Sequence, residues 1–321
     1  MADLRLGGHG GGETAARAAP VPHTSERAAA RHWRAIATPY LFLAPCILLF
    51  LIFRVYPLLQ GLYLSFTDAR LGRTEFDLVG LANYQRLLED TRFHVSMLNT
   101  TVYTLVSTVP ILALPLLLAV ALNRGASGTR ALQRGVFFFP FTLSVVTVGL
   151  TCIWLLDPVV GPFSYYARQL GLPVGSTLGD PRTAMWGVVA ASVWWVTGYY
   201  LVIYLAGLQD IPQHLYEAAA IDGASPWRSF WSITLPLLRP IFLYVVVIHI
   251  IGSFQIFGQV FVMTGGGPAD ATRTVVQHLY ETGFKERFHF GSASAISWVL
   301  FLVILVFSVL QFRFLRGRAE Y

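Results

Sequence analysis

Long runs of residues without a charged side chain most constrain what this chain can fold into. The sequence contains six such runs, each between 19 and 30 residues long. They are Ala35–Phe53, Val95–Asn123, Gly135–Leu156, Thr183–Gln209, Pro240–Ala269 and Phe288–Phe312. A hydrocarbon core about 30 Å thick requires roughly 20 apolar residues of helix, and a helix satisfies its own backbone hydrogen bonds within lipid. The runs therefore predict an all-α polytopic membrane protein with six transmembrane helices.

The composition excludes a soluble protein. Of the 321 residues, 55% are hydrophobic and 12% are charged, whereas soluble domains carry about 25% charged residues. The two cysteines, Cys46 and Cys152, lie inside apolar runs, where a free cysteine behaves as a small hydrophobic residue. They predict neither a disulfide nor a metal site.

The distribution of charge predicts the orientation in the membrane. If both termini and the second and fourth loops share one side, that side has 13 Arg and 7 acidic residues, and the other has 9 basic and 10 acidic residues. Cytoplasmic loops carry the excess of basic residues. We therefore expect a multi-pass protein of the bacterial cytoplasmic (inner) membrane with cytoplasmic N- and C-termini. Residues 1–34, rich in Gly, Ala, Arg and Pro, are expected to form a disordered cytoplasmic tail. The basic balance is explained by topology and does not indicate nucleic-acid binding.

The fourth loop has the signals of a helix-turn-helix hairpin. Pro212 suits the first turn of a helix, and the sequence over His214–Ile221 favours helix. Gly223 tolerates the positive φ that ends a helix. Ser225-Pro226 is a second cap and first-turn pair. A second short helix is predicted over Trp227–Leu235.

The hairpin contains a motif with a family resemblance. It has the order Glu217-Ala218-Ala219-Ala220-Ile221-Asp222-Gly223-Ala224, followed by Phe230, Ile233, Leu235 and Pro236. In order and spacing it resembles the EAA motif of permease subunits of binding-protein-dependent ABC importers. Gly80-Leu81-Ala82-Asn83-Tyr84 and Met263-Thr264-Gly265-Gly266-Gly267-Pro268 are similar to the carbohydrate-uptake branch of that family, the maltose and glycerol-3-phosphate type permeases. The resemblance extends from about residue 37 to the C-terminus.

The resemblance implies a fold and a set of partners. The fold is that of a type I ABC importer permease, with a transmembrane permease domain at 35–321 and a cytoplasmic coupling loop at 210–237. The implied partners are a second homologous permease subunit in a heterodimer, ABC ATPase subunits and an extracytoplasmic solute-binding protein. ATP and Mg²⁺ would bind the ATPase, so we expect no catalytic residue, cofactor or metal on this chain. The spans are expected near 37–66, 96–122, 136–156, 184–207, 240–263 and 290–313.

The resemblance also implies how the hairpin works. In such importers the loop docks into a cleft on the ATPase, so that closure of the ATPase dimer moves the membrane helices. The small Ala side chains allow close approach, and the Glu217 carboxylate is suited to pair with an Arg of the ATPase. The expected coupling residues are Glu217, Ala218, Ala219, Asp222, Gly223 and Ala224. Two roles are possible for Trp227, Phe230 and Trp231: packing under the hairpin, or direct contact with the ATPase.

Polar and aromatic residues in the fourth and fifth spans are candidates for the substrate path. His249 and Ser253 are four residues apart, so they share a helix face with Ile256, and Tyr199 lies at comparable depth in the fourth span. Hydroxyl and aromatic groups suit a sugar. The alternative is an interhelical hydrogen bond that only holds the bundle together.

The cargo and the class of transporter have alternatives. The first candidate cargo is a neutral sugar or oligosaccharide, and the second is glycerol 3-phosphate or its diesters. Arg54 is the one cation inside an expected span. Its side chain either reaches to the membrane surface or takes part in the substrate path. An ion-coupled secondary transporter would need an intramembrane carboxylate relay, and the six runs contain no Asp or Glu. A membrane enzyme would need a convergent cluster of catalytic groups, which the spans do not offer.

Overall fold

The computed structural model describes residues 38–73, 75–124, 130–285 and 288–316. The expected tail at 1–34 lies outside these residues. Within them the chain is mostly helical and has no strand, only two isolated bridges, Thr67 to Leu78 and Arg70 to His289. The chain divides into two compact units, with the boundary after Leu59.

The first unit is one apolar helix. Helix Thr38–Ser65 contains a π-helical segment, η1 (Leu51–Val55), and continues as α2 (Tyr56–Ser65) into the second unit. None of its most apolar 18-residue window is buried within the chain. Arg54, the one charged residue of this helix, lies in η1 and is exposed.

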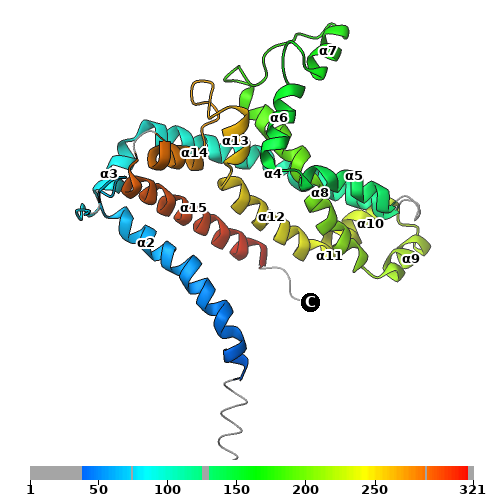
Figure 1. Cartoon of the computed structure of the whole chain (residues 1–321). Helices are drawn as coiled ribbons and strands as arrows, with labels where there is room; N and C mark the ends of the chain where they lie inside the picture. The colour runs from blue at the N-terminus through cyan, green and yellow to red at the C-terminus, as the bar shows by residue number, and fades with distance from the viewer. Residues whose placement is uncertain (1–37, 74, 125–129, 286–287, 317–321) are drawn as a thin grey trace, which may run out of the picture. The chain divides into compact units, whose positions relative to one another are not determined.

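The second unit contains the remaining helices (Figure 1). They are α3 (Ala82–Glu89), α4 (Thr91–Arg124), α5 (Arg130–Thr142), α6 (Val145–Leu155), α7 (Pro162–Gln169), α8 (Ala184–Gln209), α9 (Gln213–Ile221), α10 (Pro226–Ser229), η2 (Phe230–Thr234), α11 (Leu235–Leu237), α12 (Arg239–Phe254), α13 (Gly258–Met263), α14 (Val275–Tyr280), η3 (Glu281–Lys285) and α15 (Phe290–Arg316).

Four helices are long and apolar enough to cross a membrane. They are Thr38–Ser65, Thr91–Asn123, Ala184–Gln209 and Phe290–Arg313. Two bent pairs raise the number to six if each pair is one span: Ala131–Thr142 with Val145–Leu155, and Pro226–Leu237 with Arg239–Phe254. The described residues thus contain four to six candidate spans.

The third expected span is divided by a bend of 97° between α5 and α6. Pro140 lacks a backbone N–H inside α5. Ser144 is extended, with φ −66° and ψ 150°, and its hydroxyl accepts the N–H of Thr147 at 3.2 Å. Ser144 is therefore an N-cap that starts a new helix. The span expected near 136–156 consists of two helices and not of one continuous helix.

The fifth expected span also ends early. Helix α12 stops at Phe254, and α13 begins at Gly258 after a break at Gln255–Phe257. At Gly258 an added Cβ would come within 2.8 Å of the Val145 side chain. The break therefore allows α13 to pack closely on α6, which a continuous helix over 240–263 would not do.

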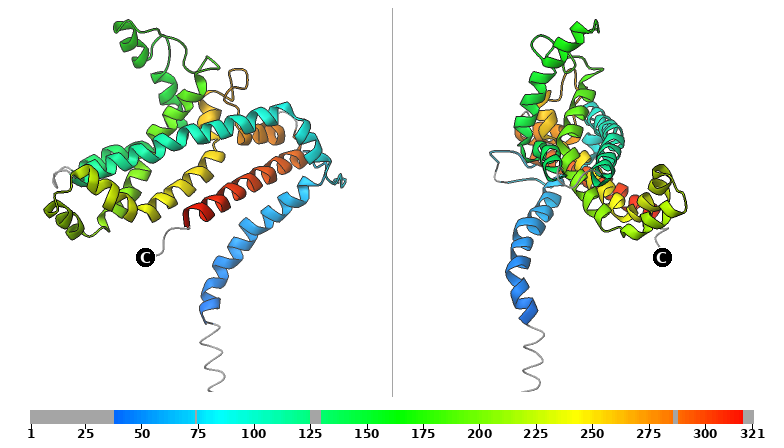
Figure 2. Two further views of the ribbon diagram at one scale, coloured as in Figure 1. Left: turned by 180° about the vertical axis from the view of Figure 1, so that it is seen from behind. Right: turned by 90° about the vertical axis from the view of Figure 1, so that its right-hand side faces the viewer.

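Helix α8 lies at the centre of the second unit, in contact with α4, α5, α12 and α13 (Figures 1 and 2). An added Cβ at Gly198 would come within 2.6 Å of the Phe138 Cα, so the glycine permits α5 and α8 to touch at the backbone. The largest buried core includes Leu201, Tyr204 and Val245. This core is continuous from α8 to the hairpin, because Phe230 of η2 belongs to it.

Candidate functional site

A cavity of about 330 Å³ opens among α4, α8, α12 and α13; we call it the central cavity. Its polar lining consists of Tyr103, Ser192, Trp195, Tyr200, His249, Ser253, Gln255 and Gln259. Its apolar lining consists of Ile111, Val145, Val196, Ile256 and Phe257, with Gly252 and Gly258. No charged side chain is among these residues.

His249 is a buried polar group of the cavity wall. It is 4% exposed, and its Nε2 lies 3.4 Å from the Oγ of Ser107 on α4. The Tyr200 ring meets the imidazole edge-to-face, with centroids 6.2 Å apart. Ser253 donates its hydroxyl proton to the carbonyl of Ile250 at 2.9 Å, so its oxygen lone pairs remain able to accept a hydrogen bond.

The structure brings three of the four expected path residues together. His249, Ser253 and Ile256 line the central cavity, and Tyr199 does not. Tyr199 instead stacks on Phe141 of α5 with centroids 4.8 Å apart. The next residue, Tyr200, faces the cavity, because successive residues of a helix point about 100° apart.

Sequence reasoning missed most of the aromatic and amide lining. Tyr103 and Trp195 come from α4 and α8, whose apolar residues show no single face that marks an inside. Gln255 and Gln259 form an i,i+4 pair that suggests a subunit contact, but α12 ends before them and both line the cavity. Only the packing of the helices shows that one cavity is lined by Tyr103, Trp195 and Tyr200 together.

The lining has a consistent chemistry. Hydroxyl, imidazole and amide groups both donate and accept hydrogen bonds, and Tyr and Trp rings provide apolar faces with a polar edge. A charged solute would enter this space without a counter-charge from the chain, which is costly at membrane depth. The cavity is therefore suited to an uncharged solute rich in hydroxyl groups.

The hairpin of α9 and α10 lies at the C-terminal end of α4 (Figure 1). Gly223, with φ +74°, ends α9, and the N–H of Ala224 bonds to the Ala219 carbonyl at 2.8 Å. Ser225 caps α10 by accepting the N–H of Arg228 at 3.3 Å. The Tyr216 and Thr234 hydroxyls, 2.9 Å apart, join α9 to η2, which follows α10. The backbone of this turn is thus defined at each step.

The expected coupling residues lie on the surface of this hairpin. Glu217, Ala218, Asp222 and Gly223 are exposed, and Ala219 and Ala224 are half-buried. Glu217 accepts a hydrogen bond from the Gln213 side chain at 2.9 Å. Of the three aromatic residues left open, Phe230 packs into the core and Trp227 and Trp231 are exposed.

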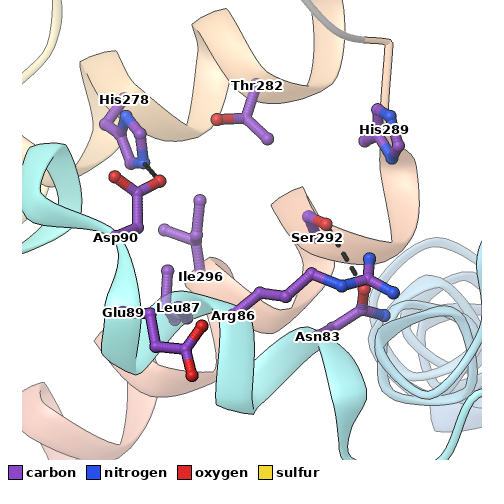
Figure 3. A pocket seen from close by; sticks show the side chains of 10 residues that line it. All are labelled: Asn83, Arg86, Leu87, Glu89, Asp90, His278, Thr282, His289, Ser292 and Ile296. Carbon is purple, nitrogen blue, oxygen red and sulfur yellow. Dashed lines mark hydrogen bonds and ion pairs between the residues drawn. The ribbon is translucent and has the colours of Figure 1, made fainter.

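A second cavity, of about 350 Å³, lies among α3, α14 and the start of α15 (Figure 3). The Asp90 carboxylate in its wall accepts hydrogen bonds from the N–H groups of Arg92 and Phe93 at the start of α4. It also lies 3.4 Å from His278 Nε2. Leu87 and Ile296 form its apolar part. No group of three or more His, Cys, Asp or Glu able to hold a metal occurs in the described part of the chain.

Buried charges next to this cavity were not expected from the sequence. Arg273 pairs with Asp270 at 2.8 Å and with Glu281, and Gln277 donates to Glu281 at 2.9 Å. Glu281 is 3% and Arg273 8% exposed. These residues belong to a polar stretch between candidate spans, so the sequence does not distinguish them from charged residues on the surface.

The motif residue Asn83 has a structural role at the same end of the unit. Its side-chain amide donates to the carbonyls of Ser65 and Thr67, both at 2.8 Å, and it is 2% exposed. The Tyr84 and Ser65 hydroxyls are 2.8 Å apart. The Gly-Leu-x-Asn-Tyr stretch therefore fixes the end of α2 against α3.

A helical fold with four to six candidate spans and a cavity that contains polar groups is typical of a polytopic membrane transporter. A family profile described as "binding-protein-dependent transport system inner membrane component" matches residues 91–318. The chain belongs to this family.

Named relatives agree with the family. The sn-glycerol-3-phosphate transport system permease protein UgpA of Agrobacterium fabrum is 35% identical over 88% of this chain and 96% of its own length. The arabinooligosaccharides transport system permease protein AraP of Bacillus subtilis is 33% identical over 92% and 94%. The lactose transport system permease protein LacF of Rhizobium radiobacter is 34% identical over 87% and 94%.

A solved structure shares the fold. A chain of a bacterial ABC transporter involved in the import of the acidic polysaccharide alginate superposes with a TM-score of 0.79 at 24% sequence identity, over 90% of this chain and all of that one. The resemblance to the type I importer permeases is therefore confirmed at the level of family and fold.

Proposed function

We propose that the chain is one of two permease subunits of an ATP-driven importer and conducts a neutral sugar or oligosaccharide through the central cavity. The observation that supports this most is the lining of that cavity, which combines hydroxyl, imidazole and amide groups with the aromatic rings of Tyr, Trp and Phe residues and has no charged side chain. Lactose and arabinooligosaccharide systems among the relatives handle solutes of this kind.

In this proposal the chain crosses the bacterial inner membrane six times, counting each bent pair as one span, with both termini in the cytoplasm. The α9–α10 hairpin then lies on the cytoplasmic side. Its exposed residues Glu217, Asp222 and Gly223 engage an ATPase subunit, which binds ATP and Mg²⁺ and performs hydrolysis. A binding protein delivers the solute from outside, and the second permease completes the path.

The proposed work of the chain is alternating access. Closure of the ATPase dimer displaces the hairpin, and Phe230 transmits the displacement because it packs in the core shared with Leu201 and Tyr204 of α8. A continuous packed core has few intermediate arrangements, so a small movement at one end changes the packing elsewhere. Helices α8 and α12, which line the cavity, thereby open it to one side at a time.

Glycerol 3-phosphate is the second candidate cargo, because UgpA relatives are 35% identical to this chain. A phosphate needs cationic partners, and the described lining of the central cavity has none. In this case the cation would come from the second permease or from Arg54.

The test is uptake by the assembled importer in proteoliposomes, with labelled neutral saccharides and labelled glycerol 3-phosphate. We expect uptake of a saccharide in the wild type and loss of uptake in Ser253→Trp, whose indole fills the cavity, while the complex still assembles. Tyr244→Trp, at an exposed position of α12 outside the cavity, is the matched control and retains uptake. Unchanged uptake in Ser253→Trp would exclude the central cavity as the path, and uptake of glycerol 3-phosphate alone would establish the second candidate.

A further inference from the structure

The segment between α6 and α8 places its apolar side chains on the outside. Residues Asp157–Leu172, which we call the α7 segment, contain α7 and its flanks, and α7 lies beyond the end of α6, away from α4 and α8, in all views (Figures 1 and 2). Its large apolar residues are strongly exposed: Val159 73%, Val160 66%, Phe163 62%, Tyr166 63% and Leu170 75%.

The polar groups of this segment form hydrogen bonds within the segment itself. The Asp157 carboxylate accepts the N–H groups of Val159 and Val160 at 2.8 and 2.9 Å. The buried Ser164 hydroxyl donates to the Asp157 carbonyl at 2.8 Å. The Arg168 guanidinium donates to the carbonyls of Val159 at 2.7 Å and Ser164 at 3.2 Å. These bonds hold the segment in one shape without any apolar core.

Exposed residues of α7 and its C-cap residue, Leu170, form a regular stripe. Phe163, Tyr166 and Leu170 occupy positions i, i+3 and i+7, which fall on one face of a helix. In a water-soluble protein such a stripe faces the core; in α7 the residue on the protein side is Ser164. The apolar stripe is therefore not buried against the rest of the described chain.

The preceding helix, α6, also exposes apolar side chains. Val146, Leu150 and Trp154 of α6 are spaced i, i+4 and i+8 and are about half exposed, at 49%, 57% and 54%. Trp186, near the start of α8, is 60% exposed. Trp and Tyr are enriched where a membrane meets water, so this aromatic set indicates the depth at which the segment lies.

We propose that the α7 segment is a membrane-surface anchor, with the Phe163, Tyr166 and Leu170 stripe inserted among the lipids at the membrane–water interface. An amphipathic helix of this type lies in the interface plane. A protein partner is a poorer fit, because protein interfaces make about one hydrogen bond per 100–200 Å² and the segment uses its Asp157, Ser164 and Arg168 groups internally. The proposal depends on membrane location and not on the cargo.

The test uses nitroxide spin labels on the assembled importer in lipid nanodiscs. Single cysteines are introduced by Tyr166→Cys and Leu170→Cys in a background with Cys46→Ser and Cys152→Ala. We expect the collision rate with oxygen, which concentrates in lipid, to exceed that with a water-soluble nickel chelate severalfold at both positions. Gln169→Cys, off the stripe on the same helix and exposed, is the control and should show the reverse ratio.

Two results would overturn the proposal. Higher collision with the nickel chelate at 166 and 170 would place the stripe in water. Immobilised spectra with low collision rates for both reagents would place it against a protein subunit. The uptake assay on each labelled complex verifies that the variants are folded. The collision rates do not depend on the cargo, so a failure of the anchor proposal is distinguishable from a failure of the proposed transport function.

Discussion

Two adjacent residues of α8 have different surroundings, and one of them contacts His249 in the cavity wall. Tyr199 packs between α8 and α5, whereas Tyr200 lines the central cavity and contacts the His249 ring. His249 has two available roles, a solute contact and an interhelical bond to Ser107. The bond to Ser107 is long, at 3.4 Å, which favours the solute contact.

Substitutions at this pair separate the two roles. We expect His249→Ala to lower saccharide uptake about tenfold, since one hydrogen bond to the solute is worth about 1 kcal/mol or slightly more. Ser107→Ala removes the interhelical partner without altering the cavity lining, and should leave uptake close to wild type. Uptake by both variants is measured with thermal unfolding of the complex as the control for stability. Equal loss of uptake in both would assign His249 to the bundle alone.

At the scale of elements, the hairpin forms where its local signals predict. Gly223 takes a positive φ after α9, and Ser225 with Pro226 begins α10. These signals act within one or two turns of helix, so they are readable without the tertiary structure. The local sequence does not predict the helix breaks at Ser144 and Gln255, because both residues stand inside uncharged runs that also suit a continuous helix.

The hairpin yields a prediction about coupling. We expect Glu217→Ala to leave an assembled complex in which solute uptake per ATP hydrolysed falls about tenfold, about 1.4 kcal/mol of coupling, because the carboxylate that engages the ATPase is lost. Gln213→Ala removes the 2.9 Å bond within α9 but keeps the carboxylate, so it should couple normally. Uptake and binding-protein-stimulated ATPase activity are measured in the same proteoliposomes. Wild-type values of both in Glu217→Ala would contradict the proposed role.

At the scale of the molecule, a buried ion pair holds the segment that follows α13. Arg273 and Glu281 pair inside the protein, and the Asn99 side chain of α4 donates to the carbonyls of Asp270 and Arg273 at 2.7 and 3.1 Å. These contacts tie residues 270–281 to α4 across more than 170 positions of sequence. Residues that lie between candidate spans are thereby part of the folded unit.

Breaking this pair should destabilise the whole unit. Arg273→Met leaves the Glu281 carboxylate buried without its cation, which costs about 3–5 kcal/mol. The double variant Arg273→Met/Glu281→Leu removes both charges and should recover most of that loss. Thermal unfolding of the detergent-solubilised complex measures both. If the single and double variants unfold at the same temperature, the pair does not contribute as proposed.

The sequence by itself determined the class of the protein, because a membrane requires about 20 apolar residues per helix and the caps of the hairpin act over a few residues. The spacing of His249 and Ser253 also places them on one helix face, and both line the central cavity; their role in transport stays a prediction. Only the tertiary structure decided that Tyr200 and not Tyr199 lines the cavity, that Gln255 and Gln259 belong to its wall, and that Arg273 and Glu281 are buried. The physical reason is that lipid-facing and bundle-facing sides of a membrane helix are both apolar, so the direction of a side chain depends on packing between distant segments.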